Sequence, residues 1–496
     1  MTNSYLCDFI QSLNTSEIRV IEGHLQRTNI IVDDNKDLKL FRAFSSNPEK
    51  SFTEIELLAI TGSTGTALRV LKSRLFDKIK EALTHDTNIL NEDLFNEIDR
   101  TIFKLTKDFL FFRISIRSHT EKKTEALAVL LDQIIATAKT FELYDILTET
   151  LAAKKYVTGI RSNVDEFNRI NGEIIFYADC LKALRYAGDC YYRIIINNEL
   201  TKSLSEKEMN AHIQSSIKQL QIDFKRTNSQ QINYYLQILL FAHSEKQKNY
   251  PLAIKQCNHL IVLLKSSKAV YRKERIGHAL LNLSQFKVFI GDYFSAAKNA
   301  EKARDYYLAN SFDNLMATEQ EFYAHFYNKT FETAHKCVNR LLEHTDIDAG
   351  AFRKAKFIYY QACISFATGA FQKAFLLLSK PLEIEKDKSR WNISLRILNI
   401  QLFIELNKIK QASHSLDALR KFIKRLEVKE EIKPRDILIV KLLREIEKDG
   451  FLFNSSNALA AKMLKELSQK DSPVSWEHYS SELIPVHEWL ESGKRA

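Results

Sequence analysis

The chain has 496 residues, 45% of them hydrophobic, and a formal net charge of +10, which is the balance of a folded protein of several units or of one continuous solenoid. It contains only 12 glycines and 6 prolines. Proteins rich in β-sheet need frequent turn residues, so this scarcity argues against a β fold. We expect an all-α protein, more than about 65% helical, with no sheet of three or more strands.

The first hundred residues are predicted to form a small helical module. Helical patterns cover residues 16–25, 36–44, 53–60 and 66–84, and Pro48 and the sequence TGSTG at 61–65 interrupt them. Residues 51–80 have the outline of a helix-turn-helix with Gly62 in the turn. The phrases DLKLFRAF and LKSRLFDKI also resemble the openings of large helical proteins of Bacteroidota, a resemblance that implies no activity and suggests a bacterial source.

The second helix of this pattern would contact phosphates if the module bound DNA. Its start lacks the Asn, Gln or Arg side chains that usually read bases, and residues 65–123 together carry a net charge of only +3. We therefore favour a structural hairpin with a solvated basic face and keep DNA binding as the alternative. The candidate nucleic-acid residues are Arg69, Lys72, Arg74 and Lys78.

Residues 101–229 are helical by pattern, and we expect irregular helix pairs there. The sequence SLSEK at 203–207 predicts a helix start capped by Ser203 or Ser205.

From residue 230 to 430 the helical segments come in pairs, and five pairs turn at a similar signature. The turns are KNYPLA (248–253), GDYFSA (291–296), KTFETA (329–334), GAFQKA (369–374) and NKIKQA (407–412). In each, a large apolar residue that fills the angle between two helices stands three places before an alanine. The alanine suits the closest crossing of the two helices, where only a small side chain fits. Gly291 and Gly369 suit the left-handed residue that ends the first helix. Upstream, Phe141 and Tyr144 echo the same spacing.

One of these stretches, NLSQFKVFIGDYFSAAKNAEKA at 282–303, resembles a tetratricopeptide repeat through Gly291, Asp292, Tyr293, Ala296, Ala300 and Ala303. The resemblance covers about residues 230–426 and implies an α-solenoid of antiparallel helix pairs that binds other proteins or peptides. It also implies that certain side chains line the inner curve. These partner-binding candidates are Tyr323, Tyr327, Tyr359, Lys356, Gln285 and Gln401.

A tyrosine-rich inner face suits peptide binding, because each ring gives a large contact area with a polar tip. The alternative, which we favour for the tyrosines, is that they pack adjacent repeats together. Residues 431–496 are predicted to add two helices, at 434–448 and 457–467. The tail that follows Asp471 is either a segment laid over the last repeat or a partly ordered extension.

Motifs for chemistry are missing from the sequence. It contains no GxGxxG or Walker A loop and no HExxH, and its one ExxH, Glu332 to His335, directly follows a repeat turn. Six scattered cysteines without a CxxC pair indicate buried free thiols in a reducing compartment. The longest uncharged stretch, residues 357–372, is too short and polar to span a bilayer, and no basic residue precedes Arg19 as a secretory signal would require.

We therefore expect a cytoplasmic, non-catalytic scaffold or adaptor that binds one or more other proteins, with no cofactor, no metal and no membrane contact. The alternative is a transcriptional regulator with an N-terminal helix-turn-helix and a tetratricopeptide-like sensor region, and only then would DNA be a partner.

Overall fold

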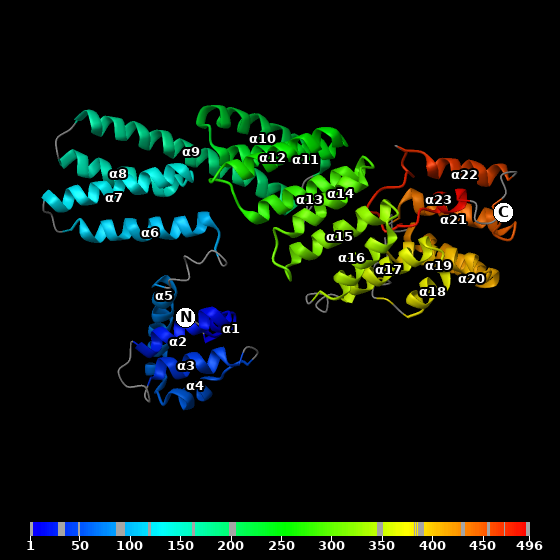
Figure 1. Cartoon of the computed structure of the whole chain (residues 1–496). Coiled ribbons are helices and arrows are strands. Elements are labelled where there is room, and N and C mark those ends of the chain that lie inside the picture. The colour runs from blue at the N-terminus through cyan, green and yellow to red at the C-terminus, as the bar shows by residue number, and fades with distance from the viewer. Residues whose placement is uncertain are drawn as a thin grey trace. The chain divides into compact units, whose positions relative to one another are not determined.

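The structure is a computed structural model that describes residues 3–27, 35–47, 50–85, 95–117, 121–160, 164–197, 205–344, 351–380, 382, 384, 391–427, 432–453, 457–470 and 472–492. These described residues are 81% helical and contain no strand, which confirms the predicted all-α class. The chain divides into two compact units, Met1–Phe111 and Phe112–Ala496 (Figure 1). Apart from residues 101–111, the expected parts 101–229, 230–430 and 431–496 all fall within the second unit.

The first unit is a bundle of short helices around an apolar core that includes Phe41 and Leu75. Its helices are α1 (Asn3–Gln11), α2 (Thr15–Arg27), α3 (Lys36–Ser45), α4 (Glu54–Thr61) and α5 (Gly65–His85), and α6 (Glu97–Ser115) crosses into the second unit. The four expected helices correspond to α2–α5, whereas α1 was not expected. The helix α4 starts at a capping box between Thr53 and Glu56 and ends at Gly62, which is left-handed at φ 58°.

The second unit contains helices that pack in consecutive pairs along the chain. They are α7 (Glu121–Thr140), α8 (Tyr144–Ile160), α9 (Val164–Ile196), α10 (Glu206–Thr227), α11 (Gln230–Lys246), α12 (Tyr250–Ser266), α13 (Lys273–Phe289), α14 (Tyr293–Arg304), α15 (Phe312–Tyr327), α16 (Phe331–Leu342), α17 (Ala351–Ala367), α18 (Phe371–Leu378), α19 (Trp391–Glu405), α20 (Ile409–Glu427), α21 (Pro434–Glu447), α22 (Ala458–Ser468) and α23 (Val486–Glu491). The helix α10 starts at the predicted cap Ser205, which forms a capping box with Glu208. The other candidate cap, Ser203, lies outside the described residues.

The five predicted turns share one backbone motif. Each first helix ends at a left-handed residue: Lys248, Gly291, Lys329, Gly369 and Asn407, with φ between 55° and 81°. The next N–H donates to a carbonyl five residues back, as from Asp292 to Lys287 at 2.9 Å, and the left-handed residue donates to the carbonyl three residues back. This pair of bonds is the Schellman motif, which satisfies the last carbonyls of the first helix. The second helix then begins at once, on the large apolar residue of the signature.

The alanines of the signature lie where the two helices of a pair cross. All five are fully buried: Ala253, Ala296, Ala334, Ala374 and Ala412. At the Ala296 crossing, the Ser284 hydroxyl on α13 donates to the Ala296 carbonyl on α14 at 2.8 Å, so only a small side chain fits between the helices. The large residues Tyr293 and Phe371 are half-buried.

A sixth turn of the same kind lies between α7 and α8, three residues away from the predicted register. Glu142 is left-handed at φ 52°, and the Leu143 N–H donates to the Ala138 carbonyl at 2.9 Å. The helix α8 begins at Tyr144, so Tyr144 is the large residue and Leu147 takes the place of alanine. The predicted pairing of Phe141 with Tyr144 is therefore wrong. Phe141 also has a large ring and lies three residues before Tyr144, so the sequence fits the signature in the wrong register.

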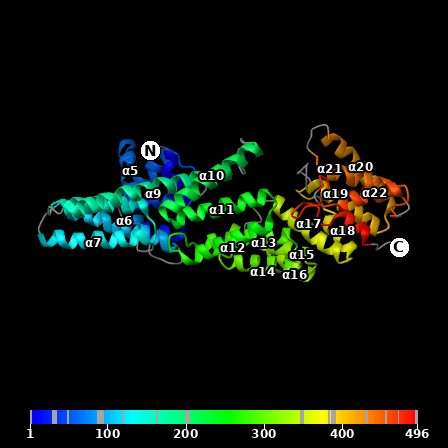
Figure 2. The ribbon, with the colours of Figure 1, turned by 90° about the horizontal axis from the view of Figure 1, so that it is seen from above.

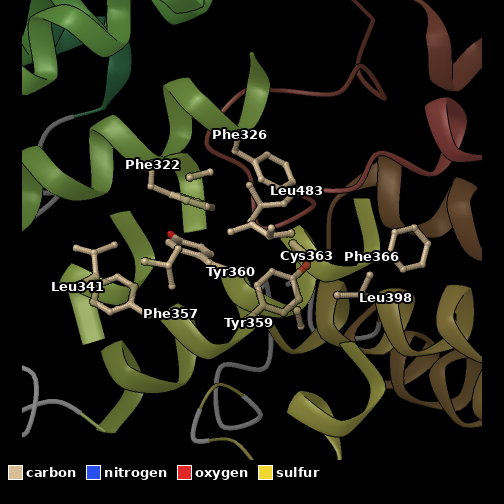
Figure 3. Close-up of a cluster of buried hydrophobic side chains, with 14 of the residues drawn as sticks. Phe322, Phe326, Leu341, Phe357, Tyr359, Tyr360, Cys363, Phe366, Leu398 and Leu483 are labelled. Atoms are coloured by element: carbon tan, nitrogen blue, oxygen red, sulfur yellow. The ribbon is translucent and has the colours of Figure 1, made fainter. Parts of the chain in front are cut away.

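The core of the helix pairs α15–α19 is aromatic. Phe322, Phe357 and Tyr360 are fully buried, and the rings of Phe322 and Tyr360 stack with centroids 4.3 Å apart. Figure 3 shows one contributor from far along the chain, Leu483, whose side chain lies among these rings. The C-terminal tail is therefore part of the core of the repeats.

Candidate partner-binding site

The C-terminal segment, defined here as residues 472–492, lies against helices of the repeats. It contacts α13, α15, α17 and α19, the first helices of four successive pairs. In Figures 1 and 2 it is the red and orange chain beside α17 and α19. Most of it, up to α23, is an irregular chain of turns and bends. The segment thus crosses the helices that the repeat resemblance assigns to the inner curve.

Hydroxyl groups of two predicted tyrosines bind the backbone of the segment. The Tyr479 N–H donates to the Tyr327 hydroxyl at 2.9 Å, and the Tyr359 hydroxyl donates to the Ser481 carbonyl at 2.9 Å. The Ser481 hydroxyl also forms a hydrogen bond with the Ser394 hydroxyl on α19 at 2.7 Å. Such bonds satisfy the backbone groups of an irregular chain irrespective of its side chains.

Side chains of the segment fill aromatic surfaces between the helices. The Tyr479 ring packs edge-on against Tyr323, with centroids 4.9 Å apart, and its hydroxyl accepts a hydrogen bond from Gln320. The Trp476 ring packs edge-on against Tyr327 at 5.6 Å. Edge-to-face pairs of this kind stabilise a contact beyond the area they bury.

A buried ion pair holds the middle of the segment against α21. Arg435 and Glu482 are each 7% exposed, and their guanidinium and carboxylate groups meet through two bonds of 2.6 and 3.1 Å. Arg435 also donates to the Val474 carbonyl at 2.7 Å, and Oε1 of Glu482, which accepts from Arg435, also accepts the Val486 N–H at 2.9 Å. The guanidinium and carboxylate groups therefore both have hydrogen-bond partners, as a buried ion pair requires.

Burial shifts the pKa values of groups where the segment contacts the repeats and α21. Desolvation lowers the pKa of His478 to about 4, and its Nε2 lies 3.0 Å from the Tyr293 hydroxyl. Burial, together with the nearby carboxylate of Glu482, raises the pKa of Asp436 to about 6. Burial also raises the pKa values of Tyr327 and Tyr479 above their usual range, so both hydroxyls stay protonated and available as hydrogen-bond donors.

The structure brings three of the six partner-binding candidates together at the segment: Tyr323, Tyr327 and Tyr359. They do not form an open face, since Tyr323 is 6% exposed, Tyr359 is 1% exposed and Tyr327 is half-buried. The physical reason is that the chain covers them with its own tail. They also pack neighbouring pairs, because the Tyr323 hydroxyl bonds to that of Tyr360 on α17.

The other three candidates lie elsewhere. Lys356 forms an ion pair with the buried Glu319 at 2.5 Å and lies over the Trp391 ring. Gln401 is 1% exposed and belongs to the interior, and Gln285 on α13 is half-buried.

Several residues that bind the segment were not anticipated. On the repeats these are Gln320, Tyr293, Ser394, Glu405 and Arg435. Gln320 could have been found, since it stands three residues before Tyr323 and so on the same helix face. Arg435 gives no such signal, because its partner Glu482 lies 47 residues away in a stretch without helical pattern.

A cavity of about 480 Å³ lies between the segment and the turns of the repeats. Its lining includes the large turn residues Tyr293, Phe331 and Phe371 on one side and Trp476 and Trp489 on the other. The Trp489 indole N–H donates to Glu405 at 2.7 Å, which ties α23 to the end of α19.

The nucleic-acid candidates lie on α5 in the first unit. Asp37 on α3 is fully buried, and its carboxylate accepts hydrogen bonds from Arg74 at 3.1 Å and from Lys78 at 2.8 Å. These two cations therefore hold α3 to α5. Arg69 is exposed, whereas Lys72 is half-buried and burial lowers its pKa. The helix-turn-helix outline forms as predicted, but two of its four basic side chains serve the fold.

The remaining features concern metal sites, cysteines and membrane-spanning helices. In the described part of the chain no group of three or more His, Cys, Asp or Glu could hold a metal ion. Glu332 is highly exposed and pairs with Lys336. All six cysteines are free and buried. No helix, among the residues that the structure describes, is long and apolar enough to cross a membrane.

Comparisons with known proteins add little detail. No family model matches the chain, and no curated protein is significantly similar to it, so nothing found supports the resemblance of the N-terminus to Bacteroidota proteins. Among the solved structures that are similar to the chain is one at 12% identity and a TM-score of 0.43, over 87% of this chain and 67% of the other. It is a signal transduction ATPase with numerous domains from Pyrococcus horikoshii that has a tetratricopeptide repeat sensor. The helix pairs and turns of this chain themselves identify it as an all-α helical-repeat protein.

Proposed function

We propose that the chain is a non-catalytic cytoplasmic scaffold that binds a partner protein through the inner helices α13, α15, α17 and α19. The observation that carries the proposal is the C-terminal segment, because it lies across these helices as a bound peptide would. In this proposal the segment occupies the surface until a partner displaces it.

The contacts favour recognition of a chain without regular secondary structure. Tyr327 and Tyr359 bond to backbone groups of the segment, while aromatic surfaces receive the side chains of Trp476 and Tyr479. Backbone bonds supply affinity that does not depend on sequence, and the side-chain sites select among sequences.

Within the segment, the stretch 474–483 is held most firmly at its two ends. Val474 at one end and Glu482 and Leu483 at the other are buried, whereas each residue from 475 to 481 is half-buried or exposed. A stretch whose residues are only partly buried opens locally at a lower free energy than the core. Residues 475–481 are therefore the part that a partner would displace.

A reversible disulfide tests the proposal. The hydroxyls of Ser394 and Ser481 lie 2.7 Å apart, so the pair Ser394→Cys and Ser481→Cys places two thiols within bonding reach, while the native cysteines are buried. Partners would be captured from the native cell, with nuclease present, by the oxidised and by the reduced double variant, and identified by quantitative mass spectrometry.

We expect the oxidised form to lose the partners that wild type recovers, and a reducing agent to restore them. The Ser481→Cys single variant, which cannot form the bond, should show no redox dependence. Equal recovery by the locked and reduced forms would show that partners bind elsewhere on the chain.

A second candidate, a DNA-binding regulator, is favoured by one observation: α4, the left-handed Gly62 and α5 form the helix-turn-helix outline. On this reading α5 would meet the phosphates through Arg69 and Lys72, with the repeats as a sensor. Measurement of DNA affinity and of its salt dependence, described in the Discussion, separates the two functions.

A further inference from the structure

The cavity beside the C-terminal segment has the size of a small-molecule site. Its volume of about 480 Å³ falls within the usual range of ligand pockets. Turn residues of three successive helix pairs form one wall, and the segment and α23 form the other. A ligand in this cavity would touch both walls at once.

The lining is rich in aromatic rings. Eight of its side chains are aromatic: Tyr293, Phe326, Tyr327, Phe331, Phe366, Phe371, Trp476 and Trp489. The rings of Phe326 and Phe331 and those of Phe366 and Phe371 pack edge to face, with centroids 5.7 and 5.2 Å apart. An aromatic face carries negative charge density and attracts cations.

The charged groups of the lining add to that preference. They are the carboxylates of Glu405 and Glu488 and one cation, the exposed Lys329. Trp489 donates to one oxygen of Glu405, which fixes the carboxylate at the wall of the cavity. The charge of Glu488 reaches the Tyr293 hydroxyl, whose pKa is raised first by burial and then by this carboxylate. Carboxylates on both walls repel anions and attract cations.

We infer that this cavity binds a small organic ammonium ion. The carbon substituents of the ion would lie against the rings, and its positive charge would face Glu405 and Glu488. Aromatic cages recognise alkylated ammonium groups in this way. A bound ion contacts the segment and the repeats together, so it would stabilise the closed position of the segment.

Choline and its neutral isostere 3,3-dimethyl-1-butanol provide the test, because they differ in charge and hardly in shape. Two of the three tryptophans, Trp476 and Trp489, line the cavity, so intrinsic tryptophan fluorescence of the full chain reports binding. We expect saturable quenching by choline and binding of the neutral isostere at least about tenfold weaker. Glu488→Gln and Glu405→Gln should each weaken choline binding several-fold and leave the isostere unchanged.

The matched control is Glu477→Gln, which removes an exposed carboxylate of the same segment that does not line the cavity, and it should bind choline as wild type does. Circular dichroism melts would establish that each variant is folded, and Glu488, which is exposed, carries the test by itself if Glu405→Gln unfolds. Equal binding of the two isosteres, no saturable quenching, or an equal loss in Glu477→Gln would overturn the inference.

Discussion

At the scale of single residues, the buried alanines are the positions where only a small side chain is tolerated. Ala296 and Ala374 are completely buried at helix crossings, and a hydrogen bond from Ser284 holds the helices together beside Ala296. Replacing either by Leu should push the two helices apart and lower the free energy of unfolding by roughly 1–3 kcal/mol. Urea unfolding measures the change. Ala351→Leu, at an exposed position of α17, should change stability little, and an equal loss there would contradict this account.

Protonation of His478 should make the protein less stable in acid. Burial lowers its pKa from 6.5 to about 4, so the folded chain loses stability as pH falls from about 6.5 towards 4. Asp436 acts in the opposite sense, because its raised pKa of about 6 costs stability as pH rises from about 4 to 6. As pH rises from 4.5 to 6.5, we expect the change in melting temperature to be shifted downward in His478→Gln and upward in Asp436→Asn, each relative to wild type. Parallel curves for all three proteins would refute the assignment.

At the scale of helices and turns, the left-handed residues decide where each pair bends. Gly291 and Gly369 have φ near 80°, and a Cβ at either position would meet nothing within 4 Å, so the cost of a side chain is a backbone cost. Gly291→Ala should therefore destabilise the chain by about 1 kcal/mol. Lys248, at φ 55°, is the reverse case, and Lys248→Gly should gain about 0.5 kcal/mol after the extra chain entropy of glycine is subtracted. Chemical unfolding of both variants checks whether the free energy of unfolding falls in Gly291→Ala and rises in Lys248→Gly.

Local signals account for what could be predicted at this scale. The five repeat turns and the helices after them follow from a few adjacent residues, because a Schellman turn needs only a left-handed residue followed by a residue that starts a helix. The upstream turn misled prediction because Phe141 and Tyr144 both have large rings. The burial of Tyr327 and Tyr359 under the C-terminal segment could not be predicted from the sequence. Their partners Tyr479 and Ser481 lie 152 and 122 residues away in a segment without periodicity.

At the scale of the whole molecule, the basic helix α5 belongs to a compact unit of its own, so its role has to be tested separately from that of the repeats. The buried Asp37 uses Arg74 and Lys78 to join α3 to α5. Removing those cations would leave a buried carboxylate without partners and would destabilise the unit, whatever the unit binds. A test of DNA binding must therefore use other positions.

Arg69 and Lys72 are those positions, and they separate the scaffold from the regulator. On the regulator reading each phosphate contact adds nearly one unit to the slope of log affinity against log salt. On the scaffold reading the full chain should bind mixed duplex DNA no more tightly than about 10⁻⁵ M near physiological salt, as expected for a basic protein without specificity. The double variant Arg69→Gln, Lys72→Gln should then keep both this affinity and its partner proteins. Tight, salt-dependent binding to a particular duplex that is lost in the double variant would instead assign α5 to DNA recognition, because the variant leaves the Asp37 ion pairs intact.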